Sequence, residues 1–178
     1  MIGEVKRLNK KVLMCAVSFL AVGMLLSIGT AFAEKPVDVE MVMFLNAEIV
    51  SAIPVGNNII SEREIVGSFT SGPVEGDVTR EIRVVIHDNG KITVQNTIYV
   101  ENAVLTLDGV VAEGSFVMKA MGMVGNVKWT IISSDLTVEG ESVKLHGQGT
   151  ATVTAFIPVD TLHYNLENTL TGQLHLTP

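Results

Sequence analysis

Residues 80–101 read REIRVVIHDNGKITVQNTIYVE, and this stretch decides the fold class. Two segments of alternating apolar and polar residues flank Asp88-Asn89-Gly90, a pattern typical of a β-hairpin. A three-residue loop pairs Ile86 with Ile92, whereas a two-residue Asn-Gly loop would place apolar side chains opposite polar ones. The pattern therefore predicts a three-residue hairpin loop in which Gly90 adopts a left-handed conformation.

The two faces of this predicted hairpin differ in polarity. The apolar face comprises Ile82, Val84, Ile86, Ile92, Val94 and Ile98. The polar face comprises Arg83, His87, Lys91, Thr93, Gln95 and Thr97. Because two isolated strands are only marginally stable in water, the rest of the chain must cover the apolar face.

The first 33 residues have the features of an export signal. Basic residues precede an apolar run from Val12 to Ile28, and Ala31-Phe32-Ala33 has the small-x-small form of a signal-peptidase site. We predict a signal helix within residues 1–33, cleavage near Ala33, and a mature chain that is secreted or periplasmic. An uncleaved membrane anchor is the alternative, because the apolar run approaches the length that spans a bilayer.

Residues 34–178 would form the mature chain, and their number suits a single domain with its own core. This chain lacks cysteine, which excludes disulfides, a thiol nucleophile and cysteine-ligated metal. It carries 18 acidic and 8 basic residues, a net charge of −10 with histidine neutral. Such a charge repels nucleic acid and anionic lipid headgroups, so we expect no nucleic-acid partner. The scarcity of aromatic residues argues against a membrane-embedded mature domain.

The alternating pattern continues through most of the mature chain. We predict a strand before Pro54, a loop-rich segment over residues 67–77, and a turn at Asn102. Apolar residues change parity between Ile131 and Leu136, which predicts a β-bulge at Ser133-Ser134-Asp135.

The next predicted hairpin has Gly140-Glu141 as its two-residue loop, which pairs Val138 with Val143.

The last two predicted strands are the longest, and they decide between architectures. Strands of such length fit a strongly curved or closed sheet, in which Gly147, Gly149 and Gly172 permit the bend. We therefore predict one all-β domain, an antiparallel up-and-down β-barrel, with a β-sandwich as the alternative. The alternation, short turns and glycine-bent strands are similar to those of calycin-type barrels, a likeness of architecture that implies little about activity.

Candidate chemistry is sparse. The four histidines are scattered and show no ligand spacing, so we expect no metal site, and no motif predicts a cofactor or a catalytic nucleophile. Glu62 and Glu64 would share one face of a strand, as a general acid and base would. Acidic residues at strand edges more often serve solubility, which is the interpretation we favour.

Our first functional hypothesis is a non-enzymatic exported β-barrel that holds a small apolar ligand within its mouth. Aromatic and flexible apolar side chains, with small residues that leave space, suit such a site. The predicted ligand-binding residues are Phe116, Met118, Trp129, Leu145, Gly147 and Gly149. One alternative is a cell-surface or matrix protein that oligomerises through its strand edges. Another is a barrel isomerase or hydrolase that uses Glu62 and Glu64.

Overall fold

The structure is a computed structural model, and it describes residues 35–178. The predicted signal helix and its cleavage site at Ala33 lie outside the described residues. Within residues 35–178 there is no helix, and thus no helical segment suited to crossing a bilayer.

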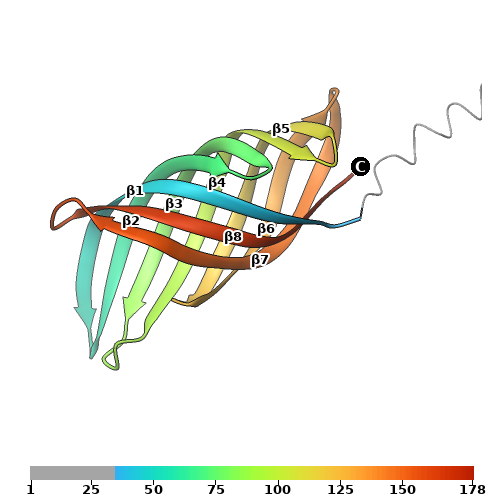
Figure 1. The fold of residues 1–178 in the computed structure, drawn as a ribbon. Coiled ribbons are helices and arrows are strands. Elements are labelled where there is room, and N and C mark those ends of the chain that lie inside the picture. The colour runs from blue at the N-terminus through green and yellow to red at the C-terminus, as the bar shows by residue number, and fades with distance from the viewer. Residues whose placement is uncertain (1–34) are drawn as a thin grey trace, which may run out of the picture. The chain divides into compact units, whose positions relative to one another are not determined.

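Eight antiparallel strands form one sheet that closes in a ring (Figure 1). The strands are β1 (Val37–Val55), β2 (Asn58–Ser71), β3 (Val74–Ile86), β4 (Ile92–Leu107), β5 (Val110–Met123), β6 (Asn126–Val138), β7 (Glu141–Pro158) and β8 (His163–Thr177). Each strand pairs with its neighbours in sequence, and β8 pairs with β1. The predictions of an all-β domain and of sequential antiparallel strands are therefore confirmed, and all eight strands belong to one sheet.

The connections fall at two ends of the ring. The turns β1–β2, β3–β4 and β5–β6 lie at the same end as the loop between β7 and β8, because successive strands alternate in direction. We call this end the β7–β8 end. The remaining three turns, Val37 and Thr177 lie at the opposite end.

The centre and the opposite end of the ring hold the buried core. Side chains alternate along each strand, so every second residue points inward. The largest fully buried side chains are Met41, Met43, Leu45, Ile65, Ile98, Leu105, Leu107, Met118, Trp129, Leu136, Leu170 and Leu174. Burying each of them contributes roughly 1.5–3 kcal/mol to the free energy of unfolding, which makes this part of the ring the main source of stability.

The central hairpin has the predicted register. Ile86 lies opposite Ile92, and Val84 lies opposite Val94. The amide of His87 donates to the carbonyl of the residue that follows the loop, at 2.9 Å, and Gly90 has a φ of 78°. The three-residue loop is thus confirmed.

The predicted loop-rich segment over residues 67–77 is wrong. β2 continues to Ser71 and β3 begins at Val74, so only Gly72-Pro73 separates them. Gly67 lies inside β2, where a Cβ atom would come within 2.9 Å of the Cα of Leu45 on β1. This glycine permits close approach of two strands and does not form a turn.

Asn102 does not end a strand either. It has a φ of 51° and lies within β4, where the register to β5 shifts between Val100 and Ala103. The left-handed conformation that Asn tolerates is used here for a bulge, which bends the strand without ending it.

The hairpin between β6 and β7 also differs from its prediction. Leu136 lies opposite Val143, and the loop consists of Glu139 and Gly140, with φ values of 51° and 87°. A two-residue loop with positive φ at both positions is the type I′ geometry that matches strand twist. The sequence-based choice of Gly140-Glu141 was therefore wrong by one residue.

The predicted bulge in β6 is confirmed. The register between β6 and β7 is interrupted between Thr130 and Leu136. Side chains bridge this interval: Ser134 Oγ accepts from the amide of Leu145 at 2.8 Å, and Thr130 Oγ1 donates to the carbonyl of Gly147 at 3.2 Å. This interruption of the register allows the inward-facing residues to change from odd to even positions between Ile131 and Leu136.

Candidate functional site

A cavity of about 440 Å³ occupies the interior toward the β7–β8 end. All eight strands contribute to its wall. Most of its lining is apolar and includes Ile49, Ile82, Val84, Ile92, Val94, Ala120, Val127, Ala151, Val153, Phe156 and Leu166. Pockets for small organic ligands span roughly 300 to 1,000 Å³ and are mainly apolar, so this cavity has the size and chemistry of a ligand site.

The side-chain volumes explain why the ring is hollow here and filled elsewhere. At the cavity Ala120 is the inward residue of β5, and Ala151 is the smallest of the inward residues of β7. Beside the cavity, the long side chains of Met118, the next inward residue of β5, and of Trp129, which lies opposite Ala120, occupy the interior. An eight-stranded ring is only wide enough for its own side chains unless small residues leave space.

The six predicted ligand-binding residues lie in the packed part of the interior. Phe116, Met118, Trp129 and Leu145 are at most 3% exposed, and Gly147 and Gly149 are half-buried on β7. None of the six lines the cavity described above. Their contact with a ligand remains a prediction.

The indole of Trp129 occupies the space that the glycines leave. Trp129 lies opposite Gly149, and Gly149 lies opposite Gly172. A Cβ atom on Gly172 would lie 2.7 Å from Cζ2 of Trp129. The indole Nε1 donates to the carbonyl of Thr150 at 3.1 Å. The space that Gly149 and Gly172 leave is therefore filled by the indole of Trp129 and is not open to a ligand.

Arg80 is the most unusual side chain of the cavity wall. It lies on β3 and is 3% exposed, and within residues 35–178 it forms no ion pair. With the amide of Asn168 oriented so that its oxygen faces Arg80, Nη1 donates to Asn168 Oδ1 at 2.8 Å. Nη2 lies 3.7 Å from Sδ of Met43, and Nε has no partner.

The guanidinium of Arg80 is charged at neutral pH despite its surroundings. Desolvation by burial lowers the pKa of Arg80 to about 9. Since this value lies above 7, the cavity wall carries a positive charge whose hydrogen-bond partners are all neutral.

Asn96 adds a second incompletely satisfied polar group. It is 8% exposed, and its Oδ1 has no hydrogen-bond partner. On the adjacent strands β3 and β4, Arg80 lies opposite Ile98 and Ile82 lies opposite Asn96, so Arg80 and Asn96 are diagonal neighbours on the inner face. Both line the cavity, so two polar groups without hydrogen-bond partners, Nε of Arg80 and Oδ1 of Asn96, lie in one region of its wall.

A second arginine lies farther along the wall. Arg63 Nη1 donates to the hydroxyl of Tyr164 at 2.6 Å, and its guanidinium carbon lies 5.2 Å from the centre of the Tyr164 ring. Phe156 stacks on Tyr164 with the ring centres 5.0 Å apart. Phe156 lines the cavity yet is 58% exposed, so Phe156 marks where the cavity meets solvent, with Tyr164 buried beneath it at 4% exposure.

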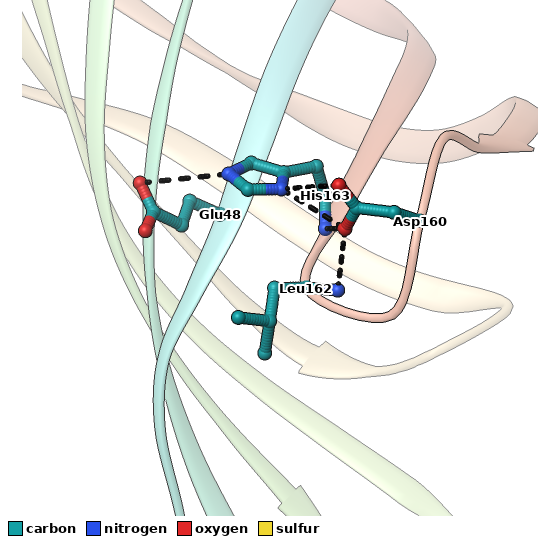
Figure 2. Close-up of polar contacts among 4 residues, drawn as sticks. All are labelled: Glu48, Asp160, Leu162 and His163. Atoms are coloured by element: carbon teal, nitrogen blue, oxygen red, sulfur yellow. Dashed lines mark hydrogen bonds and ion pairs between the residues drawn. The ribbon is translucent and has the colours of Figure 1, made fainter.

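The loop between β7 and β8 is held by a carboxylate (Figure 2). Asp160 Oδ1 accepts from the amides of Leu162 and His163, both at 2.8 Å, and Nδ1 of His163 lies 2.9 Å from the same carboxylate. These backbone and side-chain hydrogen bonds hold the pKa of Asp160 below its usual value. Nε2 of His163 lies 4.0 Å from Glu48 on β1. Asp160 and His163 both line the cavity, so this cluster shapes its rim.

Sequence reasoning missed Arg80 and Asn96, although a signal was present. Arg80 has the same parity as Ile82 and Val84, and Asn96 has the same parity as Val94 and Ile98. Extending the period of two through these polar residues places both on the inner face.

Of the four histidines, His163 alone lines the cavity, as part of the rim cluster. His146 and His175 stack with ring centres 4.9 Å apart, away from the cavity lining. Within residues 35–178 no three histidine, aspartate or glutamate side chains are grouped as metal ligands.

Glu62 and Glu64 are exposed on the outer face of β2, where they line a hollow of about 600 Å³ together with exposed side chains of β3 to β5. Neither carboxylate lines the interior cavity.

No protein family, curated protein or solved structure matches this chain.

Proposed function

We propose that this domain is a calycin-like β-barrel that binds a small, mainly apolar ligand in the 440 Å³ cavity without catalysing a reaction on it. The observation that carries the proposal is a ligand-sized interior space with apolar walls, next to a core of fully buried side chains. Apolar side chains around an unfilled space lack packing partners on one side, and a ligand supplies them.

The arrangement of the rim supports the same function. Phe156, stacked on the buried Tyr164, presents aromatic surface where the cavity meets solvent, which suits entry of an apolar molecule. The exposed carboxylates of Glu62 and Glu64 lie outside the cavity, so they offer no acid and base to a molecule bound within it.

We further propose that the domain works outside the cytoplasm. The basic start, the apolar run and the Ala31-Phe32-Ala33 motif support export. The absence of cysteine after Ala33 makes the domain indifferent to the redox state of its compartment. The intact mass of the protein purified from its own host tests cleavage directly.

Binding of a neutral fluorescent probe, N-phenylnaphthylamine, tests the ligand proposal. The domain should enhance its fluorescence in a saturable manner. Val94→Trp should weaken binding at least about tenfold, because the larger side chain would fill the cavity. Val111→Trp is the matched control, since Val111 is exposed on β5 and its replacement should leave the affinity unchanged.

Two results would overturn the proposal. One is the absence of saturable binding by the natural protein, together with native mass spectra of the host-purified protein that show no bound small molecule. The other is equal affinity of Val94→Trp and the natural protein, because the probe would then bind elsewhere. Far-ultraviolet circular dichroism of each variant establishes that it is folded.

A further inference from the structure

Arg80 is the one charged side chain among the buried residues of the described chain. Burial of a charged group in an apolar environment is costly unless an opposite charge and hydrogen bonds compensate it. Here the compensation is incomplete, because the hydrogen bonds of Arg80 go to the amide of Asn168 and the weakly accepting sulfur of Met43. The protein keeps a cation at the wall of an apolar cavity without supplying the anion.

The carboxylate that lines the same cavity is already engaged. Asp160 lies in the exposed loop between β7 and β8, where it accepts hydrogen bonds from Leu162 and His163. Arg63, the other arginine of the wall, is half-buried and donates to Tyr164 at 2.6 Å. Arg80 therefore differs from Arg63 in two ways: its charge is desolvated, and it holds no residue of the rim in place.

We propose that the natural ligand is an amphiphile with one carboxylate group, which forms an ion pair with Arg80 while its apolar part fills the rest of the cavity. The proposal rests on the ligand-binding function proposed above. A planar guanidinium offers a fork of N–H donors that matches the two oxygens of a carboxylate. Asn96 lies at the same part of the wall, where the NH2 group of its amide is a donor suited to a carboxylate oxygen.

The apolar walls favour an amphiphile over a small inorganic anion. An inorganic anion would leave most of the 440 Å³ unfilled and would gain nothing from Ile82, Val84, Ile92 or Val94. Residues 34–178 carry a net charge of −10, so the overall field of the domain does not attract anions. Affinity must therefore come from the apolar part of the ligand, and selectivity from Arg80.

Isothermal titration calorimetry with decanoate and decanol tests this assignment on residues 34–178. The two probes share an apolar chain and differ in their headgroup. We expect the natural protein to bind decanoate at least about tenfold more tightly than decanol, the range that a charge-assisted pair in a desolvated site provides. Arg80→Met should remove this preference and retain decanol binding. Arg83→Met, on the exposed face of β3, should retain the preference.

The outcomes separate the two proposals. If the natural protein binds neither probe, the ligand-binding function itself is wrong. If it binds both equally, or if Arg80→Met keeps the preference for decanoate, the cavity binds apolar molecules but the carboxylate assignment is wrong. The comparison of probes on the natural protein needs no variant, and Arg80→Gln serves as a second variant if Arg80→Met does not fold.

Discussion

At the scale of single residues, the cavity wall combines stabilising and destabilising groups. The valines and isoleucines of the wall contribute to stability by burial, whereas Arg80 carries a desolvated charge with neutral partners. Residues kept at the expense of stability are typical of functional sites, where improved stability reduces function. Arg80 is the residue at which this trade-off can be measured.

Replacement of Arg80 by methionine should stabilise the ligand-free domain. Exchange of a buried charged group for an apolar side chain of similar size often raises the free energy of unfolding. We expect a gain of about 1–2 kcal/mol, at the low end of the usual range, since the loss of the hydrogen bond to Asn168 offsets part of it. Urea unfolding monitored by circular dichroism measures the change. Arg83→Met, on the exposed face, should change stability by less than about 0.5 kcal/mol. A large loss of stability in Arg80→Met would show that Arg80 serves the fold.

Asp160 gives the rim a dependence on pH. Hydrogen bonds from the amides of Leu162 and His163 lower its pKa from 3.8. A carboxyl group with a lowered pKa in the folded state stabilises the loop at pH values above 3.8, and this contribution is lost as pH falls through the folded-state pKa. We expect an NMR titration to place the midpoint of Asp160 below 3.8, with the amide signals of Leu162 and His163 following it. A midpoint at or above 3.8 would contradict the hydrogen-bonded loop.

At the scale of elements, bulges and glycines decide how the strands meet. The register between β7 and β8 shifts between Val153 and Ala155, after which Phe156 lies opposite Leu166. The shift turns Phe156 toward the cavity, although the uninterrupted parity of the sequence places it on the outer face. The aromatic rim thus depends on one extra residue in a long strand.

The contact of β6, β7 and β8 at Trp129, Gly149 and Gly172 should be intolerant of added volume. Gly172→Ala would place a Cβ atom 2.7 Å from both the Cα of Gly149 and Cζ2 of Trp129. Overpacking of this kind costs about 1–3 kcal/mol, which urea unfolding would detect. Thr171→Ala, an exposed neighbour on β8, is the matched control and should cost less than about 1 kcal/mol. Equal effects of both substitutions would mean that the glycines are not needed for close approach.

At the scale of the whole molecule, pairing of β1 with β8 converts a meander into a ring. This pairing joins Val37–Glu48 to residues 163–174, the first and last strands of the described chain. Closure pairs edges that would otherwise be exposed, and it surrounds the cavity with strands on every side. The cavity wall is complete only when the ring is closed.

A disulfide between β1 and β8 would test this closure. Glu40 lies opposite Thr171, and both are exposed. Residues 34–178 contain no natural cysteine that could form a competing disulfide. Directly opposed residues of antiparallel strands have the Cα separation that disulfides require. The oxidised Glu40→Cys, Thr171→Cys variant should unfold with a free energy about 2–4 kcal/mol higher than the same variant in reductant, since the crosslink closes a loop of nearly the whole domain. Failure to form the disulfide would contradict the pairing of the first and last strands.

The sequence by itself determined the features that depend on near neighbours. The period of two, the central hairpin register around Gly90 and the bulge in β6 follow from alternation and turn chemistry, and the structure confirms all three. The position of the Glu139-Gly140 loop was missed because two adjacent registers satisfy the same apolar pattern nearly equally.

Only the tertiary structure decided where the interior is hollow and what lies at its wall. The space left by Gly149 and Gly172 is taken by Trp129, whereas the cavity opens between Ala120, Ala151 and residues of six other strands. Cavity volume depends on the sum of inward side chains from all eight strands and on the bulges that set their direction. No local sequence pattern contains the summed volume of these side chains, so the sequence predicted the strands but not the cavity. The closed ring of strands placed Arg80 at the cavity wall.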